Sequence, residues 1–280
     1  MPVRNTTNSI LLAVAVASGA CQSAPTNSSS SPVETITKAF LSGDGDAFAS
    51  HYATPSAVVL SDATIWRAGE LADRARSSGP AVRRWDLSST VTHDVAGGSY
   101  MLGDSVTVIE PPNVPPIHIE SRRLIQWAGA GANARIRADV SIPSRASSPI
   151  PADVLSRYGS LNGSWSEGDA AAARDHYSAD SLFVLSNGEA HSDSGLDRFF
   201  SSLSEMNVSN LVDTPTTAWM GGEDGVFVAG TFSFQIPGES GPITISGCNL
   251  DVWKLDAGVW RIAVRVAQPQ GSPTCLSDAS

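Results

Sequence analysis

The sequence predicts an α+β protein built from two tandem copies of one domain, each with about three N-terminal helices packed on a curved, mostly antiparallel β-sheet. The stretches 42–63 and 167–188 both contain Gly-Asp, a run of small residues, His-Tyr and a short apolar segment ending in Leu-Ser. Farther along, residues 115–143 align with residues 241–269 without a gap, at an offset of 126. In each copy the helical spacing of apolar residues comes first and strand alternation follows, which is typical of helices covering one face of a sheet.

The first copy opens with the signals of a helix. Ser31 is a capping residue before Pro32 at the first helical position, and Val33, Ile36 and Phe40 then recur at helical spacing. We expect an amphipathic helix whose apolar stripe faces a core.

The repeated Gly-Asp predicts a boundary between two short helices. Gly43 and Gly168 can end the first helix with a left-handed backbone, and Asp44 and Asp169 can accept hydrogen bonds from the free N–H groups of the next. We expect the second helix of each copy to continue through the His-Tyr pair.

The rest of each copy is predicted to be mostly strand. Short apolar strands are expected at Ala57–Leu60 and Leu182–Leu185, and a third helix near 69–77 and 193–203. Alternating residues separated by turn residues predict four longer strands per copy. These are expected at Trp85–His93, Ser99–Ile109, Pro116–Trp127 and Ala134–Ile142, and at Val208–Trp219, Val226–Ile236, Pro242–Lys254 and Val259–Ala267.

Composition excludes several classes of function. The chain of 280 residues has 41% hydrophobic content and a formal net charge of -10, with no basic cluster. Because phosphate binding needs Lys and Arg, we expect no nucleic-acid partner. Zinc-ligand spacing, a phosphate loop, a dinucleotide fingerprint and a Ser-His-Asp signature are all missing from the sequence, so we expect no metal and no cofactor.

The N-terminus predicts a processed and lipidated protein. Residues 1–20 read as a signal peptide, with Arg4 followed by an apolar run too short to span a bilayer. Small residues before Cys21 resemble a bacterial lipobox, in which Cys21 is lipidated, although Ser18 stands where Leu is commonest. Gln22 resembles the sorting pattern of outer-membrane lipoproteins. We therefore expect a bacterial cell-envelope lipoprotein facing the periplasm, with ordinary secretion as the alternative.

Composition also sets the domain boundaries. A Ser-rich tether is expected at 21–31, the two domains at 32–145 and 152–270, a Pro-rich linker at 146–151 and a C-terminal tail at 271–280. Lipidation of Cys21 would leave Cys248 and Cys275 as a pair in an oxidising compartment. We expect either a disulfide that ties the tail to the second domain or two unpaired thiols.

The order of helix, helix, His-Tyr, short strand, helix and four long strands ending near Trp-Arg-Ile resembles the nuclear transport factor 2-like superfamily, in particular its SnoaL-like branch. The resemblance covers both copies. It implies that each sheet bends into a cone closed by helices around an apolar pocket. Because members of this superfamily include isomerases, cyclases, dehydratases and ligand binders, the resemblance implies no single activity.

A SnoaL-like enzyme would need an Asp, His or Glu in the pocket to take a proton. The histidines shared by the copies are His51 and His176, each of which a backbone carbonyl can also satisfy. In the first copy His118 and Glu120 lie two apart on one strand face, where His118 would be a base if that face lined the cone. The second copy has Thr244 and Ser246 at these positions, so at most one domain would be active; a solvated strand face is the alternative.

Aromatic residues are the candidate ligand contacts. They can line an apolar pocket or simply fill a core. The candidates are Tyr52, Trp127, Tyr177, Trp219 and Trp253.

These observations favour an envelope lipoprotein that binds a small apolar ligand or another envelope protein. The two copies are expected to pair through the sheet faces opposite the helices as an intramolecular pseudo-dimer. The alternative is a SnoaL-like isomerase, cyclase or hydrolyase with an active site in only one domain.

Overall fold

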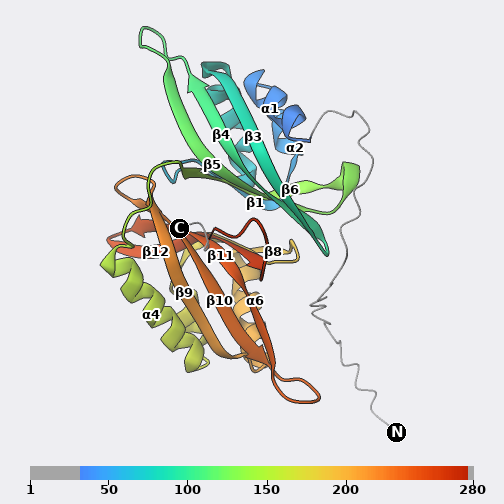
Figure 1. Ribbon diagram of the computed structural model, residues 1–280, viewed down its shortest axis with the longest axis vertical. Helices are drawn as coiled ribbons and strands as arrows, with labels where there is room; N and C mark the ends of the chain where they lie inside the picture. The colour runs from blue at the N-terminus through green and yellow to red at the C-terminus, as the bar shows by residue number, and fades with distance from the viewer. Residues whose placement is uncertain (1–31, 277–280) are drawn as a thin grey trace. The chain divides into compact units, whose positions relative to one another are not determined.

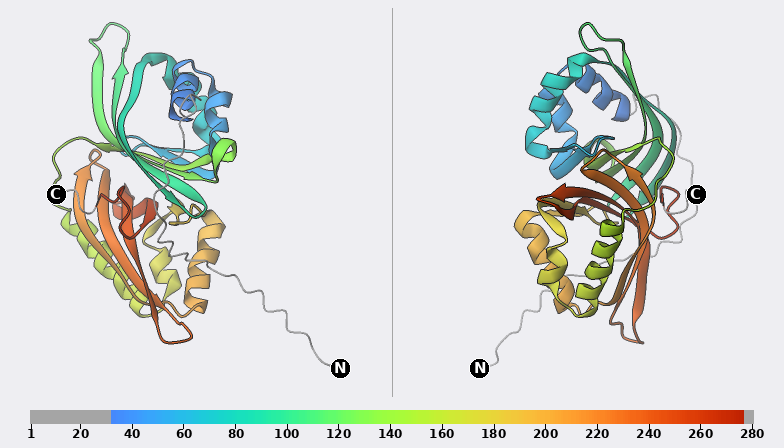
Figure 2. Two further views of the ribbon diagram at one scale, coloured as in Figure 1. Left: turned by 45° about the vertical axis from the view of Figure 1, so that its right-hand side comes forward. Right: turned by 90° about the vertical axis from the view of Figure 1, so that its left-hand side faces the viewer.

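The computed structural model describes residues 32–276, which form two copies of one α+β domain (Figures 1 and 2). The first copy contains α1 (Pro32–Leu41), α2 (Gly45–Ser50), β1 (Tyr52–Val59), β2 (Ile65–Arg67), α3 (Leu71–Ser78), β3 (Val82–Val95), β4 (Gly98–Ile109), β5 (Ile117–Ala128) and β6 (Arg135–Pro143). The second contains α4 (Ala152–Ser166), α5 (Ala170–Arg174), β7 (Tyr177–Val184), β8 (Ala190–Ser192), α6 (Asp193–Glu205), β9 (Ser209–Met220), β10 (Gly225–Ile236), β11 (Ile243–Asp256) and β12 (Val259–Pro269).

The two sheets have the same topology. Their strand orders are β2-β1-β6-β5-β4-β3 and β8-β7-β12-β11-β10-β9. Only β1 with β6 and β7 with β12 run parallel, and every other neighbouring pair is antiparallel. Both sheets curve around their own helices (Figure 2). The expected fold class, two tandem α+β domains with helices on a curved and mostly antiparallel sheet, is confirmed.

Each sheet buries its helix-covered face in a core of its own. In the first copy this core includes Phe40, Phe48 and Trp127, and in the second it includes Trp165 and Trp253. Aromatic side chains hold the helices to the sheet, as when the Trp165 and Phe200 rings stack with centroids 5.1 Å apart.

The His-Tyr pairs lie at helix ends, and the prediction that the second helix continues through them is wrong. The helix α2 ends at Ser50, and Tyr52 is already the first residue of β1. The reason is strand pairing, because Ile136 donates its N–H to the His51 carbonyl at 2.9 Å. In the second copy Ile262 donates to His176 in the same way, at 2.8 Å.

The opposite faces of the two sheets share one core cluster. Equivalent residues of the two copies take part in it, namely Leu124 with Leu250 and Val140 with Val266. Tyr100 of β4 reaches across and donates its hydroxyl to the Ala267 carbonyl at 2.7 Å and the Leu185 carbonyl at 3.1 Å. The cluster therefore joins the two copies by both apolar packing and hydrogen bonds.

Turns of the two copies also meet in a reciprocal way. A β-carbon at Gly97 of the first copy would collide with the Asn187 carbonyl, in the turn between β7 and β8. A β-carbon at Gly225 of the second copy would collide with Ala63, in the corresponding turn between β1 and β2. Each copy thus presents the same two turns to the other, as in an isologous contact.

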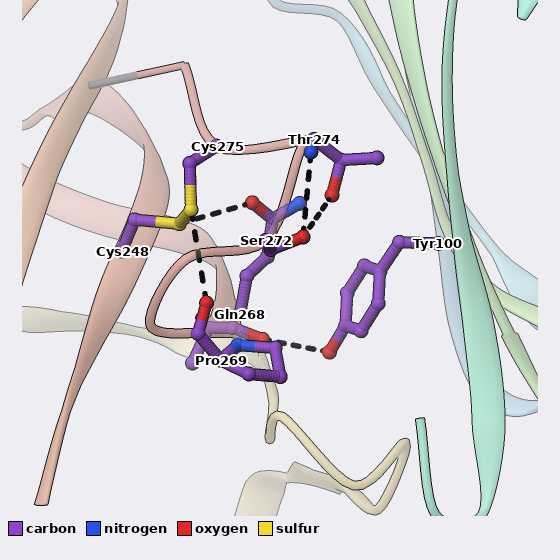
Figure 3. Close-up of a disulfide and its surroundings, with 8 residues drawn as sticks. Tyr100, Cys248, Gln268, Pro269, Ser272, Thr274 and Cys275 are labelled. Atoms are coloured by element: carbon purple, nitrogen blue, oxygen red, sulfur yellow. Dashed lines mark hydrogen bonds between the residues drawn. A yellow bond between two sulfur atoms is a disulfide. The ribbon is translucent and has the colours of Figure 1, made fainter. Parts of the chain in front are cut away.

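The C-terminal tail is fixed to the second sheet. Cys275 forms a disulfide with Cys248 of β11, and Thr274 beside it is buried and hydrogen-bonded to Ser272 (Figure 3). Leu276 is buried in the cluster shared by the sheets. Within residues 32–276, no helix has the length and apolar character needed to cross a bilayer.

Candidate functional site

The helix-covered face of each sheet carries a buried group of charged side chains. On β5 this face includes Ile125 and Trp127, members of the helix-side core, and strand alternation places Arg123 on it as well. On β11 Trp253 belongs to the helix-side core, and Asp251 and Asn249 follow on the same face. These positions place ionisable side chains inside the helix-covered core of each domain.

In the first copy the group is one ion pair. Arg123 and Asp139 are both 1% exposed, and the guanidinium donates Nε–H to Asp139 Oδ1 at 2.6 Å and a second hydrogen bond to Oδ2. Tyr52 donates its hydroxyl to Asp139 Oδ2 at 2.9 Å, and the Trp85 ring centroid lies 4.0 Å from Arg123 Cζ. The charges balance, and burial raises the pKa of Tyr52 so that it stays a donor.

In the second copy the group holds one more carboxylate. Arg265 forms two hydrogen bonds with Asp251, from Nε and Nη2, both at 2.6 Å. Its Nη1 donates to Asp213 Oδ2 at 2.9 Å. Asp251 Oδ2 also accepts hydrogen bonds from the Tyr158 hydroxyl at 2.6 Å and from the Asn249 amide at 2.8 Å. One guanidinium therefore lies between two carboxylates, and all three groups are almost fully buried.

The polarity of the ion pair is reversed between the copies. Asp139 of β6 and Arg265 of β12 are equivalent residues at the offset of 126, so Asp stands in one sheet where Arg stands in the other. The partner on the neighbouring strand changes sign too, from Arg123 on β5 to Asp251 on β11. Both sheets thus retain a buried ion pair between the same two strands, made from opposite residues.

Asp213 is the acid that the first copy lacks. Asp213 of β9 lies opposite Phe232 of β10. In the equivalent row of the first sheet, Leu87 of β3 lies opposite Ser105 of β4, so Leu87 stands where the second copy has the acid. Burial raises the pKa of Asp213, and the charge of Asp251 adds to this, while Arg265 acts in the opposite direction. Asp213 Oδ1 and the Tyr177 hydroxyl are both buried without a hydrogen-bond partner in the structure. Asp213 acts electrostatically on Tyr177, so the two groups belong to the same buried interior, where an acid with a raised pKa can hold a proton.

The structure separates the predicted bases from this interior. His118 and Glu120 are exposed on β5, on the face opposite the one that carries Arg123. His51 is half-buried, and its pKa is lowered by burial and by Arg135. His176 is buried, and its Nδ1 lies 2.9 Å from the Ala172 carbonyl, so its ring closes the end of α5.

The predicted aromatic contacts lie on both faces of the sheets. Tyr52, Trp127, Tyr177 and Trp253 are on the helix-covered faces, whereas Trp219 belongs to the cluster shared by the two sheets. Trp253 donates its indole N–H to the Tyr158 hydroxyl at 3.0 Å and so belongs to the charged group of the second copy. The Cys21 prediction lies outside the described residues.

Two hollows lie near these elements. One of about 290 Å³ is lined by Trp165, Leu203 and Val208 with polar neighbours that include Ser204 and Asn207. It lies where α4 and α6 end and β9 begins. The other, of about 420 Å³, lies between β4–β5 and the C-terminal tail, where Arg122 and Asp104 line it. Among residues 32–276 no group of three or more His, Cys, Asp or Glu side chains is placed to hold a metal.

Comparison with known proteins gives a likeness of fold alone. Neither the protein-family models nor the curated proteins include a match. Similar solved structures include a ketosteroid isomerase-like protein from Erwinia carotovora, with 15% identity and a TM-score of 0.38, covering 42% of this chain and 94% of that one. An NTF2-like protein of unknown function from Shewanella oneidensis has 16% identity and a TM-score of 0.36, covering 41% and 96%. An NTF2-like protein from Cytophaga hutchinsonii has 18% identity and a TM-score of 0.37, covering 41% and 94%.

Proposed function

We propose that the chain is a protein-interaction module of the bacterial cell envelope, anchored by a lipid on Cys21 and built from two nuclear transport factor 2-like domains. One observation carries the proposal: inside each domain the charged side chains bind one another. Arg123 is held by Asp139, and Arg265 by Asp251 and Asp213. Such groups fix the fold of a core and leave the outer surface to make contacts.

The size of the hollow beside Trp165 favours a protein partner over a small ligand. Its volume of about 290 Å³ is at the lower limit of pockets that enclose small molecules, which hold roughly 300–1,000 Å³. A hollow of this size accommodates one or two side chains of a partner. The other hollow, of about 420 Å³, lies within that range, but Asp104 and Arg122 in its lining do not suit an apolar ligand. The small apolar ligand is therefore the weaker of the two binding proposals.

We infer further that the two copies act as an intramolecular pseudo-dimer. The shared core cluster, the Tyr100 hydrogen bonds and the reciprocal turns support this inference. Because these contacts use the outer sheet faces within one chain, we expect the protein to be a monomer whose partners bind elsewhere.

In-cell photo-crosslinking tests the interaction role. A benzoylphenylalanine is placed at Glu239, in the β10–β11 loop, and in a separate variant at Val114, in the equivalent β4–β5 loop of the first copy. We expect a discrete cross-linked adduct with a second protein, competed away by an excess of the unlabelled chain. Failure to form any adduct at either position or elsewhere on the exposed surface would contradict the proposal.

Metabolic labelling tests the proposed lipid anchor. A labelled fatty acid should be incorporated into the full chain and not into its Cys21→Ala variant.

One observation favours an enzyme in a single copy as the second candidate. Asp213, with its raised pKa, and the Tyr177 hydroxyl without a partner occur together only in the second domain. These residues could move a proton at a carbon next to a carbonyl. Turnover of carbonyl-activated substrates that is lost in Asp213→Asn and kept in Asp139→Asn would establish this candidate.

A further inference from the structure

The two copies differ greatly in charge. Residues 32–145 contain 12 acidic and 11 basic residues, a net charge of -1, whereas residues 152–270 contain 15 acidic and 6 basic residues, a net charge of -9. Nearly all of the chain's formal charge of -10 is therefore carried by the second copy. A surface of this sign attracts cations and basic segments.

The second copy also has an apolar surface that its helices leave uncovered. Strand alternation continues the helix-covered face of β10 and β11 toward their shared loop, where opposite pairs are Phe234 with Ile245 and Ile236 with Ile243. Phe232 lies one row nearer the core, and its ring stacks on Phe234 with centroids 6.2 Å apart. We call these five residues the distal hairpin face. Within residues 32–276 none of them belongs to a core cluster, and Ile243 is 52% exposed.

The distal hairpin face and the hollow beside Trp165 lie at the same end of the sheet. Ser209 lines that hollow and pairs with Gln235 of β10. Figures 1 and 2 show the β10–β11 hairpin extending to the end of the second sheet at which α4 and α6 also end. The hollow and the distal hairpin face are therefore neighbours at this end of the second sheet.

The charges around this end are all negative. Glu167 follows α4, Glu205 ends α6 and Glu239 lies in the hairpin loop; we call these three residues the acidic rim. All three are exposed, and none forms an ion pair in the described part of the chain. No Lys, Arg or His occurs in residues 165–170, 203–212 or 232–247. The C-terminal ends of α4 and α6 add their negative partial charges to the rim.

The first copy lacks this combination. Its β4–β5 hairpin has Ser105 and Thr107 at the positions of Phe232 and Phe234. This equivalence follows from strand pairing: Ser105 lies opposite Ser121, Phe232 lies opposite Gly247, and residues 121 and 247 are equivalent at the offset of 126. At the corresponding end, Arg83 is paired with Glu110 at 2.9 Å. The half-exposed aromatic pair and the unpaired acids of this end are therefore found in the second copy and not at the corresponding end of the first.

We propose that the distal hairpin face with its acidic rim docks a basic amphipathic segment of a partner protein, one that presents apolar side chains between Lys or Arg residues. This inference rests on the proposed interaction function and deepens it. Three rows of paired residues span about 13 Å of open sheet, which suits a peptide segment better than an enclosed small molecule. The acids would pair with the basic residues of the segment and exclude acidic partners.

Binding of defined peptides to the full chain tests the proposal. The probe is a fluorescent amphipathic peptide of about five helical turns made of Lys and Leu, measured by anisotropy. Two comparison peptides keep its spacing, one with Glu in place of Lys and one with Ser in place of Leu. We expect only the Lys and Leu peptide to bind tightly, with an affinity that falls as salt is raised.

Matched variants locate the site. Phe232→Ser with Phe234→Thr should weaken binding at least about tenfold, and Glu167→Gln with Glu205→Gln and Glu239→Gln should reduce both affinity and its salt dependence. Ile117→Thr, at the position equivalent to Ile243, is the control and should leave binding unchanged. All variants alter exposed or half-exposed side chains, and circular dichroism checks their folding.

Several results would overturn the inference. One is that the Lys and Ser peptide, or the Glu and Leu peptide, binds as tightly as the Lys and Leu peptide. Another is that Ile117→Thr weakens binding as much as the double Phe variant does. A third is that the same face binds neutral lipid vesicles. If cross-linked adducts form from Glu239 and Val114 and still form in the Phe232→Ser, Phe234→Thr variant, the partner does not bind the distal hairpin face, while the interaction role stands. If no adduct and no peptide complex form, both fail.

Discussion

At the scale of single residues, the informative feature is the guanidinium of Arg265 between Asp251 and Asp213. Two carboxylates and one guanidinium leave one negative charge among almost fully buried side chains, which is costly. A proton on Asp213 removes that charge, and the raised pKa of Asp213 has this cause. The side chain is thus expected to exchange a proton as pH changes.

The pH dependence of stability tests this behaviour. In the unfolded chain Asp213 loses its proton at about pH 4. In the folded protein Asp213 stays protonated up to its raised pKa, so only the folded state holds this proton between the two pKa values. The stabilisation is therefore complete below about pH 4 and is lost as pH rises through the folded pKa. Urea unfolding of wild type and Asp213→Asn across this range should show that the difference in unfolding free energy changes with pH. A constant difference would show that Asp213 does not titrate there.

Asp251→Asn is the contrasting variant. Asp251 provides both oxygens of the bidentate pair, so its loss leaves Arg265 without its main partner. We expect a loss of about 3 to 5 kcal/mol, measured in the same unfolding experiment. An effect smaller than that of Asp213→Asn would contradict the roles assigned to the two acids.

These residues were not predicted from the sequence, for a physical reason. Titratable groups identical in both copies are the sequence signal of a shared site, and a reversed ion pair has none at the equivalent positions 139 and 265. Opposite charges at aligned positions of two apolar strands were the available signal. Conversely His118 and Glu120 share a strand face, but alternation alone does not say which face the helices cover.

At the scale of elements, prediction succeeded where the local pattern decides the structure. All eight long strands begin and end within three residues of the predicted bounds, because alternation and turn residues are local signals. The strands β1 and β7 instead begin five residues earlier than expected. Their first halves are fixed by pairing with β6 and β12, far along the chain, which local sequence does not reveal.

Helix capping by the repeated Gly-Asp gives a prediction at this scale. Asp169 accepts the Ala172 N–H at 2.9 Å and caps α5. Asp169→Ala should lower the unfolding free energy by about 0.5 to 2 kcal/mol, and Asp169→Asn should retain most of it, since Asn also caps. Thermal unfolding measures both. Equal losses for Ala and Asn would show that charge matters and capping does not.

The disulfide gives a second prediction for an element, the C-terminal tail. Cys248 and Cys275 are 27 residues apart, and closing a loop of this size stabilises a fold by about 3 to 4 kcal/mol. Cys275→Ser should lose stability by this amount, and hydrogen exchange should rise at Thr274 and Leu276. Unchanged protection of the tail would mean that Leu276 packing alone holds it.

At the scale of the whole molecule, the contact between the copies is the feature to test. Gly225 lies against Ala63, whereas a β-carbon at Gly69 would meet nothing within 4 Å. Gly225→Ala should therefore destabilise the contact between the copies, and Gly69→Ala should not. Differential scanning calorimetry should show a single transition for wild type that broadens or splits in Gly225→Ala. Identical traces for both variants would contradict a coupled pair.

The reversed ion pair has a consequence for how such a chain reaches its native state. Tandem repeats with nearly the same topology can exchange equivalent strands during folding and become trapped. If β6 and β12 traded places, Arg265 would enter the core that contains Arg123, and Asp139 would enter the core that contains Asp251. Each hybrid would bury like charges together, an arrangement far less stable than either correct one. Opposite polarity therefore distinguishes two otherwise interchangeable partners and directs each strand to its own half of the chain.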